Sequence, residues 1–127
     1  IKDVRGNLNI VEAKRQCPFE IKRLFYVTRV PIGQCRGGHA HRELEQLIIC
    51  ASGCLTIFVR DGRESRKIRL LPDSGMLYIP PLIWAEQVDF TEDTVMLVVA
   101  SDHYDESDYI RCYDEFLHVR GDKDNEY

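Results

Sequence analysis

Short runs of β-branched and aromatic residues, each stopped by a turn signal, fill the middle of this chain. Residues 54–60 alternate between apolar and polar character up to Asp61-Gly62, a pair typical of a β-hairpin turn, and residues 65–70 provide the returning strand. Further runs of this kind are 21–28, 76–79, 84–90 and 95–100. Because short strands recur at close spacing and helical periodicity is scarce, the sequence predicts an all-β sandwich or barrel.

The C-terminal part breaks this rhythm. Residues 101–111 are polar and acidic, and large apolar side chains then recur at helix-like spacing. These side chains are Tyr109, Ile110, Tyr113, Phe116 and Leu117. We therefore expect a short helical segment packed on the edge of the barrel. His103 and His118 are expected at the surface, and the charged tail from Gly121 is expected to be loose.

Length and composition limit the class of protein. The 127 residues suffice for one domain with its own core, so we expect a single domain over residues 1–127. The missing initial Met is compatible with excision from a longer polypeptide. No run of about 18 apolar residues occurs, which argues against a membrane span.

Charge and cysteine content point to a cytoplasmic protein without nucleic-acid binding. Seventeen basic and twenty-one acidic residues give a net charge of −4, whereas binding to phosphate backbones needs a basic face. The five cysteines are odd in number and lack paired metal spacing, and the chain begins without a signal-peptide pattern. Reduced thiols in the cytoplasm are the natural interpretation.

Two histidines, His39 and His41, follow a glycine-rich turn that carries Arg36. On a strand, side chains two positions apart share a face, so one side of this strand should carry both imidazoles. The apolar run 47–50 follows, and we expect the pair where a loop enters a buried strand, at the mouth of a pocket. Histidine titrates near neutrality and serves as a general acid or base or as a metal ligand.

The spacing from Gly33 to Gly53 resembles the first signature motif of the cupin superfamily, in which HxHxxxE supplies three metal ligands. Those ligands would be His39, His41 and Glu45. The second cupin motif brings another histidine, and the corresponding stretch, 75–86, contains none. We therefore favour acid–base use of the histidines without a metal, while a metal-dependent enzyme remains the alternative.

Five blocks together resemble a family of sugar 3,4-ketoisomerases. They are Asp-x-Arg-Gly-x-Leu at 3–8, Pro-Phe-x-Ile-Lys-Arg at 18–23, Arg-Gly-x-His-Ala-His at 36–41, Pro-x-x-Trp at 81–84, and the segment 100–111. The resemblance implies a small cupin-type jelly-roll barrel that forms a homodimer and works without a cofactor. It also implies a thymidine-diphosphate-linked (TDP-linked) 4-keto-6-deoxy sugar as substrate. An aminotransferase would then make 3-amino-3,6-dideoxy sugars for lipopolysaccharide O-antigen, S-layer glycans or antibiotics.

By this resemblance His39 is the principal acid–base residue and His41 lies close by in the same site. Moving a ketone from C4 to C3 requires a base near neutral pKa and donors for the enediolate. Arginine forks suit diphosphate oxygens, and a phenol suits the enediolate. The candidate substrate-binding residues are Arg5, Arg23 and Arg36, with Tyr26 as a donor.

Two positions depart from the family pattern, and they loosen the expectation for stereochemistry and rate more than the expectation for reaction class. Phe25 stands where relatives often have a tyrosine, and Ala85 follows Trp84 where several relatives have a polar or basic residue. The stereochemistry at C4, galacto or gluco, stays open. A non-catalytic nucleotide-sugar-binding cupin, fused to or partnered with a transferase, is the alternative from another functional class.

Overall fold

The computed structural model describes residues 1–124, which form eleven strands, one 3-10 helix and one α-helix. The strands are β1 (Lys2–Asp3), β2 (Gly6–Asn7), β3 (Arg23–Thr28), β4 (Arg36–His41), β5 (Gln46–Ser52), β6 (Leu55–Arg60), β7 (Ser65–Leu70), β8 (Leu77–Ile79), β9 (Trp84–Val88), β10 (Val95–Ala100) and β11 (Tyr109–Ile110). The helices are η1 (Glu106–Asp108) and α1 (Tyr113–Asp124).

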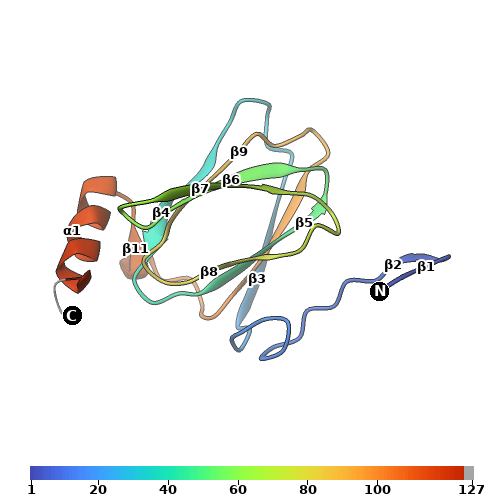
Figure 1. Cartoon of the computed structure of the whole chain (residues 1–127), viewed down its shortest axis with the longest axis horizontal. Helices are drawn as coiled ribbons and strands as arrows, with labels where there is room; N and C mark the ends of the chain where they lie inside the picture. The colour runs from blue at the N-terminus through green and yellow to red at the C-terminus, as the bar shows by residue number, and fades with distance from the viewer. Residues whose placement is uncertain (125–127) are drawn as a thin grey trace.

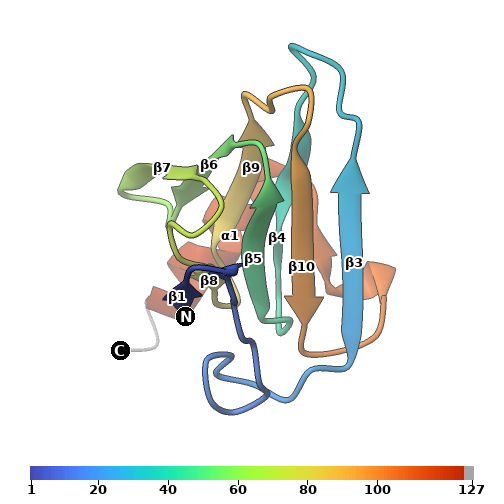
Figure 2. The same cartoon turned by 90° about the vertical axis from the view of Figure 1, so that its right-hand side faces the viewer.

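Two antiparallel sheets face each other and enclose the interior of a barrel (Figure 1). One sheet has the order β3-β10-β5-β8, and the other has the order β11-β4-β9-β6-β7. Figure 2 shows β5, β10 and β3 side by side, with β4 and β9 behind them. The predicted all-β barrel with a C-terminal helix is confirmed.

Local sequence explains the hairpin between β6 and β7. The Asp61 carboxylate accepts hydrogen bonds from the backbone N–H groups of Arg63 and Glu64, both at 2.8 Å. Gly62 takes a φ of 99°, which a residue with a side chain rarely adopts. The strands therefore turn within residues 61–64, as the Asp-Gly pair predicts.

Alternation along the strands fills the barrel with apolar side chains. Ile48 and Cys50 of β5, Leu55 and Ile57 of β6, and Val98 of β10 belong to one buried cluster. Burying an aliphatic side chain of this size contributes about 1.5–3 kcal/mol. This cluster is the main core of the molecule, and the residues around it position the functional groups.

The C-terminal segment differs in part from the prediction. Tyr109 and Ile110 do not begin a helix but form β11, which pairs with His41 and Ala40 of β4. The unpaired edge of β4 accounts for this, because it offers backbone hydrogen bonds that an extended segment can use. Helix α1 then lies outside the barrel (Figure 1), where Phe116 is fully buried.

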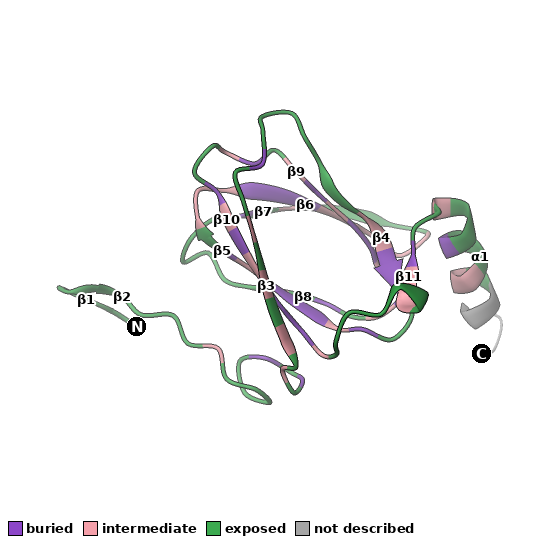
Figure 3. Ribbon diagram, turned by 180° about the vertical axis from the view of Figure 1, so that it is seen from behind, coloured by how far each residue is buried: buried purple, intermediate pink, exposed green. Residues whose placement is uncertain are grey.

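The expectation of a loose tail from Gly121 was wrong, because α1 continues to Asp124; residues 125–127 lie outside the described part. His103 and His118 are exposed, as predicted. The N-terminal arm with β1 and β2 extends away from the barrel and is exposed along its length (Figure 3). Within residues 1–124 no helix is both long and apolar enough to cross a membrane.

Candidate active site

Strand β4 carries the predicted histidine pair. The rings of His39 and His41 lie on the same side of the strand, with centroids 5.0 Å apart and planes at 80°. The strand does not run on into the apolar run, however. Strands β4 and β5 belong to opposite sheets, so the chain crosses the barrel between them. The two histidines therefore lie on one wall and the apolar side chains of β5 on the facing wall.

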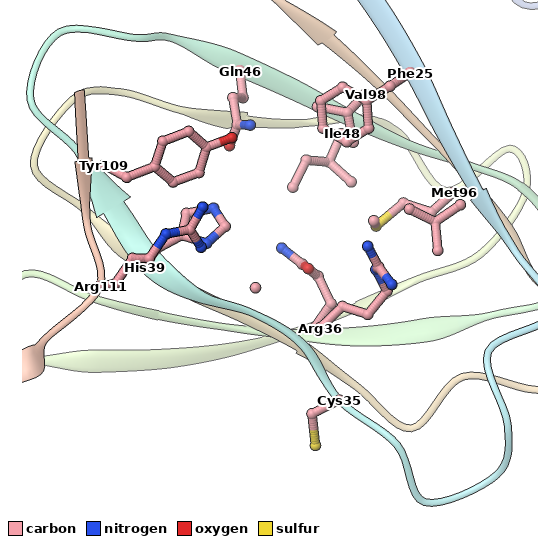
Figure 4. A pocket seen from close by; sticks show the side chains of 13 residues that line it. Phe25, Cys35, Arg36, His39, Gln46, Ile48, Met96, Val98, Tyr109 and Arg111 are labelled. Atoms are coloured by element: carbon pink, nitrogen blue, oxygen red, sulfur yellow. The ribbon is translucent and has the colours of Figure 1, made fainter. Parts of the chain in front are cut away.

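A β-bulge in the glycine-rich segment re-aims the side chains of β4. Gly37 pairs with Glu86 and His39 pairs with Ala85, so Gly38 is left over in the ladder. Both glycines have a φ of 79°, which suits a residue without a side chain. Without the bulge, Arg36 and His39 would point to opposite faces. With it, both line the same cavity (Figure 4).

The cavity lies between the two sheets and has a volume of about 380 Å³. One part of its wall is apolar and the other is polar (Figure 4). The apolar lining consists of Phe25, Val27, Ile48, Met96 and Val98. The polar lining includes Arg36, His39, Gln46, Gln87, Tyr109 and Arg111. A polar ligand with an apolar face, such as a deoxy sugar, matches such a surface.

His39 is the histidine that reaches the cavity. Burial, together with the neighbouring charges of His41 and Arg111, lowers its pKa to about 4, against opposing effects of Glu106 and the Gly37 backbone. Its Nδ1 atom is buried and has no hydrogen-bond partner within residues 1–124. The imidazole is therefore neutral at physiological pH and can accept a proton.

His41 lies behind His39 and is only 4 % exposed. Its Nδ1 atom is 3.1 Å from Oδ2 of Asp108. A carboxylate only accepts, so Nδ1 donates and Nε2 keeps its lone pair. Burial lowers the pKa of His41, while the hydrogen bond and charge of Asp108 raise it. The pair thus combines one histidine at the cavity wall with one that is oriented by a carboxylate.

Tyr109 and Arg111 complete the wall beside the histidines. The Tyr109 ring centroid lies 4.9 Å from that of His39 and 4.4 Å from that of His41. The Arg111 guanidinium covers the other side of this ring at 4.2 Å, and Glu106 holds it through two hydrogen bonds of 2.7 and 2.9 Å. These hydrogen bonds, with one from Tyr104, lower the pKa of Glu106 to about 2. A fixed positive charge therefore borders the cavity.

A backbone contact fixes β4 from outside the barrel. Leu82 has a φ of 60°, unusual for a residue with a side chain, and its N–H donates to the carbonyl of His41 at 2.7 Å. Its own carbonyl accepts from Nη1 of Arg120 in α1 at 3.0 Å. Helix α1 is thereby connected to the histidine strand through one residue.

The predicted substrate-binding residues separate into two groups. Arg36 lines the cavity. Arg23 contacts the ring of Phe25, a cavity residue, at 5.4 Å, and its buried Nε has no partner in the described chain. Tyr26 is 67 % exposed on the outer face of β3, since Phe25 takes the inward position. Arg5 lies in the exposed N-terminal arm, where Asp3 binds it at 2.9 Å. The structure brings Arg23 and Arg36 to the histidines, but not Tyr26 or Arg5 of the same chain.

The alternative metal set does not assemble. The Glu45 carboxylate accepts a hydrogen bond from the Tyr78 hydroxyl at 2.5 Å. Across the part of the chain that the structure describes, no three His, Cys, Asp or Glu side chains are grouped to hold a metal ion. The HxHxxxE spacing therefore does not translate into a three-ligand site.

Sequence reasoning missed Gln46, Gln87, Asp108, Tyr109 and Arg111. For Tyr109 and Arg111 a signal existed, because residues at positions i and i+2 of an extended segment share a face. For Gln46, Gln87 and Asp108 the sequence offers no comparable mark, since single polar residues are common at surfaces.

Comparison with known proteins identifies the family. A family model described as FdtA, WxcM-like, C-terminal, matches residues 1–121. The chain belongs to this family. It is also 43% identical over 116 residues to TDP-4-oxo-6-deoxy-alpha-D-glucose-3,4-oxoisomerase of Aneurinibacillus thermoaerophilus, covering 91% of this chain and 84% of the relative. The resemblance predicted from the sequence is confirmed.

Solved structures of this family share the fold. The QdtA 3,4-ketoisomerase of Thermoanaerobacterium thermosaccharolyticum, in complex with TDP, superposes with a TM-score of 0.92 at 43% identity, over 97% of this chain and 90% of that one. A 3,4-ketoisomerase from Helicobacter canadensis gives 0.90 at 40% identity, over 95% and 91%. The sugar epimerase NovW of Streptomyces spheroides, at 17% identity over 86% of this chain and 63% of that one, has a TM-score of 0.71 and shares the fold alone.

Proposed function

We propose that this protein is a 3,4-ketoisomerase that moves the carbonyl of a TDP-linked 4-keto-6-deoxyhexose from C4 to C3. The observation that carries the proposal is His39, a neutral imidazole at the cavity wall of a chain 43% identical to a 3,4-oxoisomerase. A histidine-to-asparagine variant of QdtA, 43% identical to this chain, has been crystallised with TDP-4-keto-6-deoxyglucose. This supports a substrate of the same class here.

In the proposed mechanism His39 removes the proton from C3 of the sugar. The electrons form the C3–C4 double bond, and the C4 oxygen becomes the enediolate oxygen. The proton on the C3 hydroxyl passes to the C4 oxygen, and the imidazolium of His39 then protonates C4, which leaves the carbonyl at C3. A single base that removes the C3 proton, exchanges it with solvent and then protonates C4 suits this sequence.

The surrounding residues supply charge and orientation. The cations of Arg23, Arg36 and Arg111 lie at or beside the cavity and suit a diphosphate and a developing enediolate. His41 adjoins His39 without lining the cavity, so its proposed role is support of His39 and of the Tyr109 ring. Replacing His41 should therefore cost less activity than replacing His39.

Incubation with TDP-4-keto-6-deoxyglucose in deuterated water tests the function. We expect NMR spectra of a 3-keto product with solvent deuterium at C4, and the configuration at C4 follows from the same spectra. Tight binding of the sugar nucleotide without any product would reject the isomerase and favour the non-catalytic binding protein. An aminotransferase and amino donor added to the reaction test the proposed downstream step, since only a 3-keto product yields a 3-amino sugar.

We also propose that a second copy of the chain covers the outer face of the four-stranded sheet. Leu24 and Tyr26 on this face are 59 % and 67 % exposed, and Val4 and Leu8 in the N-terminal arm are exposed as well. Exposed apolar side chains of this kind mark protein interfaces. Sedimentation equilibrium should give a dimer, and Leu24→Glu should weaken it, whereas a monomeric wild type would contradict the proposal.

A further inference from the structure

Two carboxamides from opposite sheets face the cavity without hydrogen-bond partners. Gln46 begins β5 in one sheet, and Gln87 lies in β9 of the other. Each is 8 % exposed, and both line the cavity together with His39. Within residues 1–124 neither side-chain amide makes a hydrogen bond. Figure 4 shows Gln46 extending into the cavity near Tyr109.

The two amides are not sealed inside the protein, because both glutamines line the open cavity. Within residues 1–124 no other side chain or backbone group occupies their donor and acceptor atoms, so these atoms can bind a ligand. The two buried threonines of the chain are paired: Thr56 accepts from Arg69 at 2.9 Å, and Thr94 donates to the Cys54 carbonyl at 2.8 Å. The glutamines therefore stand apart from the other buried, uncharged polar side chains.

The fold also makes room for one of these amides. A Cβ atom on Gly37 would lie 2.9 Å from Oε1 of Gln87 and 2.9 Å from the Ala85 carbonyl oxygen. The bulge that turns Arg36 and His39 toward the cavity thus also provides the space that the Gln87 carboxamide occupies. The bulge at Gly37 and Gly38 therefore orients His39 and also leaves room for the Gln87 side chain.

The chemistry of a carboxamide matches a carbonyl that changes place. During the proposed reaction a hydroxyl oxygen becomes a carbonyl oxygen, and its neighbour changes in the opposite sense. A carboxamide can donate to a carbonyl or enediolate oxygen and accept from a hydroxyl, without gaining or losing a proton itself. Phe25 has no donor and Tyr26 faces outward, so no phenol from β3 is available for this task.

We propose that Gln46 and Gln87 bind the two neighbouring sugar oxygens between which the carbonyl moves, and that they donate hydrogen bonds to the enediolate. The inference rests on the proposed function and deepens it, because it assigns contacts to the reacting end of the sugar. The arginines at the cavity are left for the diphosphate.

Gln46→Met and Gln87→Met test this, because methionine is similar in length and lacks the amide. We expect each to lower kcat by about 10²–10³-fold, the loss typical of a removed oxyanion donor. Because neither amide bonds another group within residues 1–124, the melting temperature of the free protein should stay close to that of the wild type. Gln34→Met, in an exposed loop, is the matched control and should change neither.

Unchanged kcat in both variants would overturn the inference. So would a lower melting temperature that accompanies the loss of kcat, since that would indicate a structural role.

A binding measurement separates this inference from the proposed isomerisation. In a His39→Asn background, calorimetry compares TDP with TDP-4-keto-6-deoxyglucose. Adding Gln46→Met or Gln87→Met should weaken binding of the keto sugar nucleotide by about tenfold, equal to one hydrogen bond, and leave TDP binding unchanged. Equal affinity for the keto sugar with and without the glutamines would overturn the inference even if the wild type isomerises. An inactive wild type that shows the tenfold difference would overturn the isomerase and support the contacts.

Discussion

Two regions of the barrel interior, one packed around β6 and β7 and the other lining the cavity, differ in how their polar groups are treated. In the packed region Leu55 and Ile57 are fully buried, and Thr94 has partners for its hydroxyl. At the cavity wall and directly behind it, Nδ1 of His39 and Nε2 of His41 are buried and have no partner within the described residues. The packed region stabilises the fold, whereas the cavity keeps polar groups available for a ligand at a cost in stability.

His39→Asn should give the largest effect and should affect only the cavity. We expect kcat to fall by about 10²–10⁴-fold, the usual contribution of a positioned general base, with TDP binding retained. Steady-state kinetics and calorimetry measure the two quantities. His103→Asn, at an exposed histidine, is the control. Turnover by the His39 variant near the wild-type rate would remove His39 from its assigned role.

Gly53→Ala should damage the packed region and spare the chemistry. Gly53 has a φ of 70°, and an added Cβ would lie 2.6 Å from the hydroxyl oxygens of Thr91 and Thr94. We expect a loss of about 2–3 kcal/mol in the free energy of unfolding, measured by urea denaturation. At low temperature kcat should be unchanged. If kcat fell while stability did not, the division between the two regions would be wrong.

Gly33→Ala separates the two causes of the expected loss at Gly53, which are backbone strain and the clash of the added Cβ with the threonines. Gly33 has a φ of 87° with nothing within 4 Å of an added Cβ, so only backbone strain acts there. Its loss should be about 1–2 kcal/mol, smaller than that of Gly53→Ala.

Asp108→Asn should have a moderate effect, because the Asp108 carboxylate binds His41 and also the backbone N–H groups of Glu43 and Leu44. The carboxylate raises the pKa of His41 by hydrogen bonding and charge, so its loss should move the acidic limb of the rate profile to lower pH. We expect kcat to fall about tenfold to a hundredfold, as for loss of a charge-assisted hydrogen bond. Asp105→Asn removes a neighbouring carboxylate whose side-chain hydrogen bonds within residues 1–124 all go to Ser107, and its pH profile should match the wild type.

The smallest expected effect is a difference in the pH dependence of stability. The pKa of His39 falls from 6.5 in the unfolded chain to about 4 in the folded protein, so the unfolded chain binds the proton first. The free energy of unfolding does not depend on this titration above pH 6.5, and it declines as the pH falls toward about 4. The urea midpoint of the wild type should therefore fall more on acidification than that of His39→Asn. Parallel curves would show that burial of His39 carries no such cost.

Local periodicity explains what could be predicted from the sequence. The barrel strands and the shared face of His39 and His41 follow from alternation over a few residues. Alternation also separates Phe25 from Tyr26, but it does not say which of them faces inward, because packing on β10 decides that. The bulge at Gly37 and Gly38 shifts the register, and so the common orientation of Arg36 and His39 was not predictable from spacing.

Contacts between distant segments account for the rest of the site. Asp108 is 67 residues from His41 in the sequence and reaches it because β11 pairs with β4. Gln46 and Gln87 meet at one cavity only because their two sheets face each other. No pattern within one strand marks either glutamine as different from a solvated surface residue. The structure distinguishes the two glutamines because their side-chain amides have no hydrogen-bond partner within the described residues.

The left-handed Leu82 has a consequence for how this enzyme family can diversify. Its N–H holds the His41 carbonyl, and Arg120 holds its own carbonyl from helix α1. The contacts that hold β4 in place thus lie on the exterior of the barrel, whereas Phe25 and the two glutamines line its cavity. A residue such as Phe25 can therefore be exchanged for another sugar substrate while His39, the proposed general base, keeps its position on β4.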